Sequence, residues 1–433
     1  MTKSDAAISR RTMLAGAAAL AGGTALEALG SQSAEPSASA LRVPPAGSAG
    51  GTPEAPATAA VPPDATKIVG APTSPLSVRS PFETPVRTPV GVVTGASFTP
   101  IHQLSGTIVP SDLHFERHHA GVAQIDPNRY KLLVHGLVDR PLSLTLDDIR
   151  SFPPVTRTHF LECAGNGRTA YRSPKPEMTP QLVDGMVSNA EWTGVSVATI
   201  LREVGIRDDA RWALAEGGDA AVLSRSIPVE KLLDDAILVY AQNGEALRPA
   251  AGYPVRLLLP GWEGNTCIKW IRRLELIRQP NMSRDETSKY TDPLANGTAR
   301  QFSFVLDAKS TITSPTYPAR LVKDRWTQIS GLAWTGRGRI VRVDVSTDGG
   351  RTWTEAELQE PVQAKALTRF SHLWRWDGKP AVMMSRSIDE TGYVQPTYRQ
   401  FAEGRGLGTD YHFNCIRSWA VRAGGEVVFG VPA

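Results

Sequence analysis

The sequence predicts a mixed α+β domain followed by an all-β sandwich of immunoglobulin type. Between about residues 100 and 300, short apolar runs typical of strands occur in irregular order with short helical segments, which favours α+β over regular βαβ winding. From about residue 305 onward, period-two runs are separated by turn residues and almost no helical pattern is left. We therefore expect a catalytic domain over residues 82–304 and a sandwich over residues 305–433.

The elements of the first domain follow from its apolar runs. Two segments predict short helices, Leu146–Ser151 and Val195–Val204, and Thr145 can cap the first of them. Runs of apolar and β-branched residues predict four strands, at Tyr130–Val138, Ile237–Ala241, Val255–Leu259 and Ile268–Ile277.

The second domain shows its clearest pattern at residues 339–346, where apolar and polar residues alternate. Thr347-Asp-Gly-Gly350 then supplies the residues of a turn before Trp353. This pattern predicts an antiparallel hairpin, and similar short strands follow it.

Composition limits the function classes. The chain has 433 residues, 41% hydrophobic and 21% charged, which excludes global disorder and predicts two or three domains. A net charge of +4 does not predict binding to nucleic acid or to an anionic membrane. Three cysteines cannot form a disulfide framework, and no apolar run is long enough to cross a bilayer.

Residues 1–33 are predicted to be a twin-arginine export signal. Arg10-Arg11 precedes a short, weakly apolar stretch, and small residues near positions 31–33 or 38–40 offer two regions for cleavage. A chance pair before an amphipathic helix is the alternative. Residues 34–81 are rich in Pro and Ala, and the first aromatic residue is Phe82, so we expect an extended linker. The signal predicts a periplasmic protein that is exported already folded.

One motif, Thr158-His-Phe-Leu-Glu-Cys-Ala-Gly-Asn-Gly-Arg168, is the most informative stretch for function. A predicted strand runs into Cys163, and the glycines that follow allow close approach of a bulky group. Arg168, five residues on, is expected to lower the pKa of the thiol and to attract an anion. Taken alone, a buried cysteine is more often inert packing.

Four stretches together resemble the sulfite oxidase family of molybdenum enzymes. They are the cysteine motif, Phe115-Glu-Arg-His-His119, the region from Tyr253-Pro-Val-Arg256 to Cys267-Ile-Lys-Trp270, and Val345-Ser-Thr-Asp-Gly-Gly-Arg-Thr-Trp353. The resemblance spans roughly residues 105–430 and is most similar to the sulfane dehydrogenase branch. It implies a pterin-bound molybdenum cofactor with Cys163 as the protein's thiolate ligand, since soft sulfur donors suit that metal.

The resemblance also implies a pocket for a sulfur oxyanion. Arg117 and Arg168 match the family's substrate arginines, and Tyr290 matches a tyrosine near the metal. A third arginine comes from the second domain in the family, and Arg405 is the candidate here, with Arg417 left open. These four residues, Arg117, Arg168, Tyr290 and Arg405, form the expected catalytic set.

Cofactor contacts are implied at a larger set of positions. They are Phe115, Arg117, His119, Cys163, Asp219, Arg256, Cys267, Ile268 and Lys269. Arg256 and Lys269 would hold the pterin phosphate, and the side chains of Cys267 and Cys415 are expected to be structural. Ala251 stands where the family usually has a histidine. A zinc site at His118-His119 is the alternative interpretation of that pair, and no further ligand spacing supports it.

The chain has no Cys-x-x-Cys-His, so we expect no haem on it and electron transfer to a c-type, dihaem cytochrome. The resemblance implies oxidation of sulfur bound to a cysteine arm of a carrier protein, with a homodimer of this chain inside a heterotetramer. Oxidation of free sulfite is the alternative. A non-catalytic binding protein is a third possibility, and joint retention of Cys163, Arg117 and Arg168 argues against it.

Overall fold

A computed structural model describes residues 64, 67, 69–294, 296–406 and 408–430 of the chain. The predicted export signal lies outside these residues, as does most of the predicted linker. A compact unit begins at Val78 and contains both predicted domains. In the part of the chain that the structure describes, no helix is both long and apolar enough to span a bilayer.

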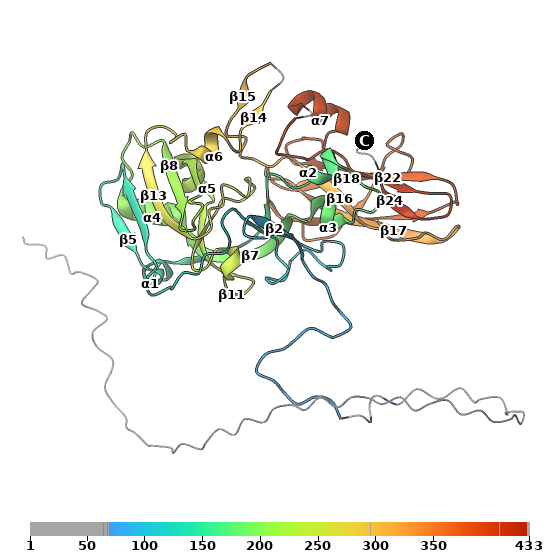
Figure 1. Cartoon of the computed structure of the whole chain (residues 1–433), viewed down its shortest axis with the longest axis horizontal. Helices are drawn as coiled ribbons and strands as arrows, with labels where there is room; N and C mark the ends of the chain where they lie inside the picture. The colour runs from blue at the N-terminus through green and yellow to red at the C-terminus, as the bar shows by residue number, and fades with distance from the viewer. Residues whose placement is uncertain (1–63, 65–66, 68, 295, 407, 431–433) are drawn as a thin grey trace, which may run out of the picture. The chain divides into compact units, whose positions relative to one another are not determined.

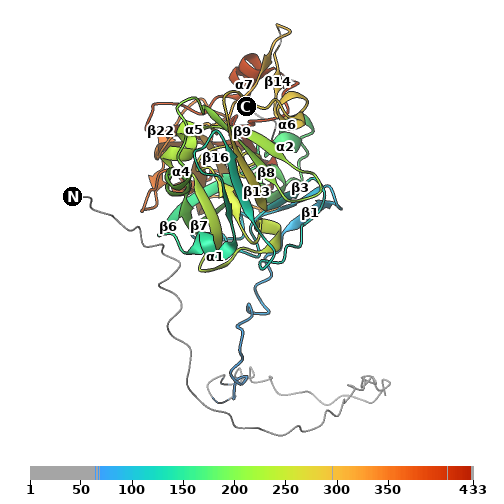
Figure 2. The ribbon, with the colours of Figure 1, turned by 90° about the vertical axis from the view of Figure 1, so that its left-hand side faces the viewer.

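The first domain is built on two five-stranded sheets and a smaller N-terminal sheet (Figures 1 and 2). One large sheet has the order β11-β10-β7-β6, with β12 also paired to β10. Its strands are β6 (Pro154–Glu162), β7 (Val187–Ser196), β10 (Ile237–Gln242), β11 (Glu245–Ala246) and β12 (Arg256–Leu258). The other has the order β5-β4-β13-β8-β9. Its strands are β4 (Leu132–Gly136), β5 (Leu142–Leu144), β8 (Trp212–Gly217), β9 (Ser224–Pro228) and β13 (Ile271–Ile277).

The N-terminal sheet leads into the site, because its third strand carries the Phe-Glu-Arg-His-His segment. Its strands are β1 (Thr88–Gly91), β2 (Gly95–Phe98) and β3 (Glu116–His118). The helices of the first domain are short: α1 (Leu146–Arg150), α2 (Arg168–Arg172), α3 (Pro180–Asp184), α4 (Val197–Val204), α5 (Val229–Asp234), the 3-10 turn η3 (Pro249–Ala251) and α6 (Arg284–Thr287).

One core fills the space between the two large sheets. Val134 of β4, Leu274 of β13, Trp192 of β7 and Ile200 of α4 are all fully buried within it. Burial of this apolar surface is the main term that holds the two sheets together.

The second domain is a sandwich of two antiparallel sheets, with orders β16-β17-β21-β20 and β19-β18-β22-β23-β24. The first contains β16 (Lys309–Ser314), β17 (Trp326–Trp334), β20 (Glu357–Leu358) and β21 (Thr368–Arg375). The second contains β18 (Ile340–Ser346), β19 (Thr354–Glu355), β22 (Ala381–Asp389), β23 (Ser418–Val421) and β24 (Val427–Phe429). A small hairpin of β14 (Asp292–Pro293) and β15 (Ala299–Arg300) precedes them.

The two domains share part of their cores. Ala170 of α2 and Val183 of α3 are buried in the same cluster as Ile312 and Trp419 of the sandwich. Figure 1 shows α2 and α3 beside β16 in the middle of the molecule. The segment that follows Cys163 is therefore packed against the second domain.

The predicted fold class is confirmed, and three details of the prediction were wrong. Val195 and Ser196 belong to β7 rather than to α4, and β13 begins at Ile271 because residues 268–270 form a turn that ends with Trp270 at φ 52°. Helix α7 (Tyr398–Arg405) interrupts the sandwich. Its start is encoded by a capping box between Thr397 and Gln400.

Candidate active site

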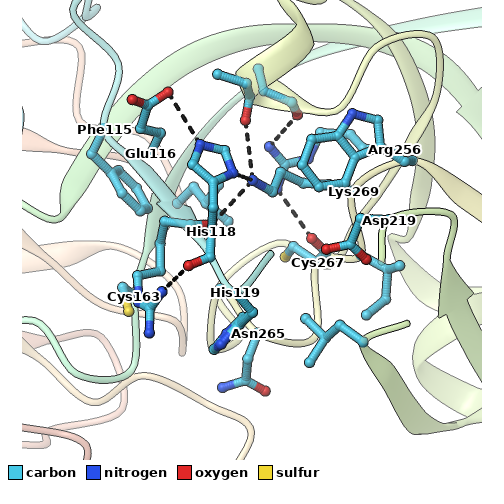
Figure 3. Close-up of a pocket in the computed structure, with 18 of the residues that line it drawn as sticks. Phe115, Glu116, His118, His119, Cys163, Asp219, Arg256, Asn265, Cys267 and Lys269 are labelled. Atoms are coloured by element: carbon cyan, nitrogen blue, oxygen red, sulfur yellow. Dashed lines mark hydrogen bonds and ion pairs between the residues drawn. The ribbon is translucent and has the colours of Figure 1, made fainter. Parts of the chain in front are cut away.

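Ten of the predicted site residues line one cavity with an empty volume of about 740 Å³ (Figure 3). Strand β3, the end of β6 and residues 250–270 contribute most of its wall. The ten are Phe115, Arg117, His119, Cys163, Asp219, Arg256, Cys267, Ile268, Lys269 and Tyr290. Arg168 and Arg405 are not among the residues that line it.

Cys163 is held by the strand that precedes it and the turn that follows. Its N–H donates to the Met186 carbonyl at 3.0 Å, and its own carbonyl accepts from the Asn166 N–H at 2.9 Å. Gly264 lies against this strand end, donating to the Glu162 carbonyl at 2.7 Å, and a Cβ at Gly264 would approach that oxygen to 2.7 Å. A side chain at position 264 would therefore displace the cysteine strand.

Arg168 lowers the pKa of the cysteine thiol, as expected, but the net pKa of Cys163 is still raised. Burial raises the pKa of Cys163, and the hydrogen bond from Gly165 and the charges of Arg117 and Arg168 offset only part of that rise. Desolvation is the larger effect because the thiolate loses its water. A soft metal ion would still bind the sulfur as a thiolate despite this raised pKa, because coordination displaces the thiol proton.

The far end of the cavity is basic. The Lys269 ammonium donates to the carbonyls of Arg117 (3.1 Å) and Ala250 (3.2 Å) and to Nδ1 of His118 (2.8 Å). Burial, followed by the nearby Arg256 charge, lowers the pKa of Lys269 to about 7. An anion placed here would favour the charged ammonium.

Arg256 is the second cation of this end. It is 2% exposed, donates to the carbonyls of Ala251 (2.9 Å) and Cys267 (3.2 Å), and lies over the Trp192 ring at 5.3 Å. Its Nε has no hydrogen-bond acceptor among the described residues. A buried guanidinium with an unused donor at a cavity wall is suited to an anionic ligand.

His119 and Tyr290 meet across the middle of the cavity, with 3.1 Å between Nε2 and the phenol oxygen. Burial and then Arg117 lower the pKa of His119 to about 4, and burial raises the pKa of Tyr290. Both groups are therefore uncharged at neutral pH. Tyr290 has φ 49°, a conformation that non-glycine residues seldom adopt without a local reason.

The predicted arginines differ in placement. Arg117 donates to the carbonyls of Gly95 (3.2 Å) and His118 and lies in the cavity wall. Arg168 begins α2, and its Nε and Nη2 donate to the carbonyl of Asp410 at 3.0 and 2.6 Å. Both lie close enough to Cys163 for their charges to act on its thiol.

Arg405 and Arg417, the two candidates for a second-domain arginine, are both engaged elsewhere. Arg405 forms ion pairs with Asp292 (3.4 Å) and Asp307 (3.5 Å). Arg417 is buried, and its Nε lies 3.7 Å from Asp184 while Nη2 donates to the Phe413 carbonyl at 3.0 Å. The geometry does not bring either residue into the cavity wall.

Sequence reasoning missed several residues of the site. Nε2 of His118 lies 3.3 Å from the Glu116 carboxylate, and Asn265 contributes to the wall. The Tyr411 ring packs against the Tyr290 ring in a tilted arrangement, with centroids 5.0 Å apart. The motif spacing could have indicated Asn265, which lies inside the quoted stretch, but nothing local indicated Tyr411. Among the described residues, no group of three or more His, Cys, Asp and Glu side chains is arranged to hold a metal ion.

The cavity fits a pterin cofactor carrying molybdenum. Its wall includes the Cys163 thiol and, at the basic end, Arg256 and Lys269, and the Nε of Arg256 has no acceptor among the described residues. Soft thiolate ligation suits molybdenum, and paired cations suit a phosphate.

Comparison with known proteins decides the family. The oxidoreductase molybdopterin binding domain matches residues 119–284, and the Mo-co oxidoreductase dimerisation domain matches residues 300–417. Sulfite oxidase of Gallus gallus is 32% identical over 314 residues, covering 67% of this chain and 68% of the relative. The chain belongs to the sulfite oxidase family.

The chain covers different shares of the length of other relatives in the sulfite oxidase family. Mitochondrial sulfite oxidase of Mus musculus is 32% identical over 318 residues, and the chain spans 58% of its length. A crystal structure of the sulfane dehydrogenase SoxCD from Paracoccus pantotrophus matches with TM-score 0.83 and 43% identity, covering 88% of this chain and 100% of that one. The resemblance to the sulfane dehydrogenase branch is thus confirmed.

Proposed function

We propose that this chain is the molybdenum-binding subunit of a periplasmic sulfane dehydrogenase, which oxidises sulfur bound to a cysteine of a carrier protein. The observation that carries the proposal is the match to SoxCD, at 43% identity over the whole of that chain. The cavity supports it, because the Cys163 thiol and the basic side chains of Arg117, Arg256 and Lys269 line the same space as Tyr290.

The residues at the two ends of the cavity would have different roles, metal ligation at one end and phosphate binding at the other. Cys163 would ligate molybdenum, which supplies two-electron oxidation and oxygen transfer to sulfur when it is bound. Arg256 and Lys269 would hold the pterin phosphate, with His119, Asp219 and the 267–268 backbone beside the ring system. These contacts would orient the cofactor along the cavity that Cys163 lines.

Arg117 and Arg168 would orient an anionic sulfur substrate near Cys163. Tyr290 would remain a protonated phenol, because burial raises its pKa, and would serve as a fixed hydrogen-bond donor. Its contact with His119 holds the phenol in position. The chain itself thus provides orientation and desolvation at the reacting end.

Electrons would leave to a c-type, dihaem cytochrome subunit, since we expect no haem on this chain. The match of residues 300–417 to a dimerisation domain supports a homodimer of this chain, within a heterotetramer that includes the cytochrome. The Arg10-Arg11 pair supports export to the periplasm by the twin-arginine route.

The decisive experiment is a side-by-side assay of the purified complex. The chain is isolated from the periplasm with any co-eluting cytochrome, its molybdenum content is measured, and sulfite is compared with a persulfidated carrier protein. Higher kcat/KM on the persulfidated carrier supports the proposal. Higher kcat/KM on sulfite would replace it with the second candidate.

That second candidate is a periplasmic sulfite dehydrogenase. It is favoured by the identity of about one third to sulfite oxidases of animals. A third candidate, a binding protein without metal, is disfavoured by the retention of Cys163 and Arg117 in one cavity, and absence of molybdenum from the purified protein would support it.

A further inference from the structure

Tyr411 of the second domain lies beside Tyr290 and Arg168 at the substrate end of the site, although it is not among the residues that line the cavity. The Tyr411 ring lies 5.0 Å from the Tyr290 ring, and the Arg168 guanidinium lies over the Tyr411 ring at 5.4 Å. The side chain is also close enough to Cys163 for the charge of that sulfur to act on it. Tyr411 therefore belongs to the group of side chains around the reacting end.

The backbone around Tyr411 is fixed to the cysteine turn on both sides. Before it, the Asp410 carbonyl accepts two hydrogen bonds from Arg168, at 3.0 and 2.6 Å. After it, the His412 N–H donates to the Ala164 carbonyl at 2.8 Å.

Two more features hold this segment. His412 has φ 62°, and its Nε2 contacts the carboxylate of the buried Glu263. A non-glycine residue in this conformation implies that the surroundings determine it. The backbone that carries Tyr411 is accordingly held beside the cysteine turn.

The charge at this end is lower than the sequence predicts. Arg405 and Arg417 are paired with aspartates outside the cavity. Arg168 uses two of its donors on the Asp410 carbonyl, which leaves fewer donors for a bound anion. Because burial raises the pKa of Tyr411, its hydroxyl is neutral at physiological pH.

A neutral phenol and a charged guanidinium select different sulfur substrates. A compact dianion needs several converging cations to replace its lost hydration. A sulfane sulfur carried on a thiol has at most one charge, and it gains from contact with an aromatic ring. Specificity is the difference between the affinities of the site for these two substrates, so the charge of the side chain at this position affects it.

We propose that Tyr411 is a specificity-determining residue that favours a singly charged, thiol-bound sulfane sulfur over the free sulfite dianion. This inference rests on the proposed function and names the residue that produces its substrate preference. It would hold even if the carrier protein were replaced by a small persulfide.

The test compares wild type with Tyr411→Arg and Tyr411→Phe, each loaded with molybdenum and assayed with a small-molecule electron acceptor. The probes are sulfite and a short cysteine peptide bearing a persulfide. Tyr411→Arg should shift the ratio of kcat/KM values toward sulfite by roughly tenfold or more, the effect of one added charge-assisted hydrogen bond. Tyr411→Phe keeps a neutral aromatic ring at this position, so its ratio should stay close to that of wild type.

A second variant keeps the test decisive if Tyr411→Arg binds less molybdenum. In Tyr411→His the introduced imidazole can gain or lose a proton within the same folded protein. The ratio of kcat/KM on sulfite to kcat/KM on the persulfide, divided by the wild-type ratio at the same pH, should therefore be higher at pH 6 than at pH 8. An unchanged ratio in both variants at normal molybdenum content would overturn the inference. A wild type that prefers sulfite would overturn the proposed function instead, so the two failures are distinguishable.

Discussion

The ammonium of Lys309, in the first strand of the sandwich, lies 2.7 Å from the carboxylate of Asp184 in the catalytic domain. The same ammonium lies 3.0 Å from Glu162, the residue before Cys163. All three side chains are buried, and Arg417 lies 3.7 Å from Asp184 on the other side. The second domain thus reaches the strand that presents the cysteine through a water-excluded ion network.

Lys309→Met should destabilise the chain by about 3 kcal/mol, because two buried carboxylates would lose their main counter-charge. Burial alone would raise the pKa of Asp184, and Lys309 and Arg417 hold it below its ordinary value. The loss should therefore shrink toward acidic pH, as the unpaired carboxylates take up protons. Urea unfolding measures it, with the exposed Lys379→Met as the control that should not differ from wild type.

If the unfolding midpoint of Lys309→Met equals that of wild type, the network contributes nothing to holding the domains together. Its role would then be confined to the orientation of Glu162, whose other partners are the Asn166 amide (2.9 Å) and the Trp334 indole (2.7 Å).

Cys163→Ala should remove one sulfur neighbour from molybdenum and abolish turnover, while the phosphate contacts of Arg256 and Lys269 retain the pterin. X-ray absorption at the molybdenum edge counts the sulfur neighbours. Cys267→Ala is the matched control, since the Cys267 sulfur interacts with the Leu259 backbone instead. Equal sulfur counts in wild type and Cys163→Ala would place the protein ligand elsewhere.

Replacing Arg10 and Arg11 by lysine should leave the precursor in the cytoplasm. The export receptor reads the guanidinium pair, and lysine preserves only the charge. Cell fractionation and immunoblotting give the distribution. Normal periplasmic accumulation of the double variant would show that residues 1–33 are not a twin-arginine signal.

Much of the fold could be predicted because its signals are local. The alternation at residues 339–346 became β18, and the apolar run at Ile237 became β10. Helix α7 was missed because its short polar sequence has little amphipathic pattern, although Thr397 and Gln400 form a capping box.

Residues of the site could be predicted only where they lie within a recognisable sequence motif. Cys163, Arg117 and Lys269 come from three separate stretches, and the structure brings them into one cavity. Tyr411 has no such signal, because its role depends on contacts with Tyr290 and Arg168 across long stretches of chain. The lowering effect of Arg168 on the Cys163 thiol pKa could be predicted because neighbouring charge is visible in a sequence. The larger, opposite effect of burial could not, because desolvation depends on the completed fold.

Lys269 should make the stability of the cofactor-free protein depend on pH. Burial and Arg256 lower its pKa in the folded state to about 7, whereas an unfolded lysine holds its proton up to about pH 10. Between these values the unfolded state binds more protons, so wild type should gain stability relative to Lys269→Met as the pH rises. Thermal unfolding of protein made in a host that lacks the pterin pathway measures this difference, with Lys379→Met as the exposed control. A difference that stays constant across this range would mean that Lys269 is not titrating there. Added inorganic phosphate should oppose the trend, because an anion beside Lys269 favours the charged ammonium and its binding should weaken above about pH 7.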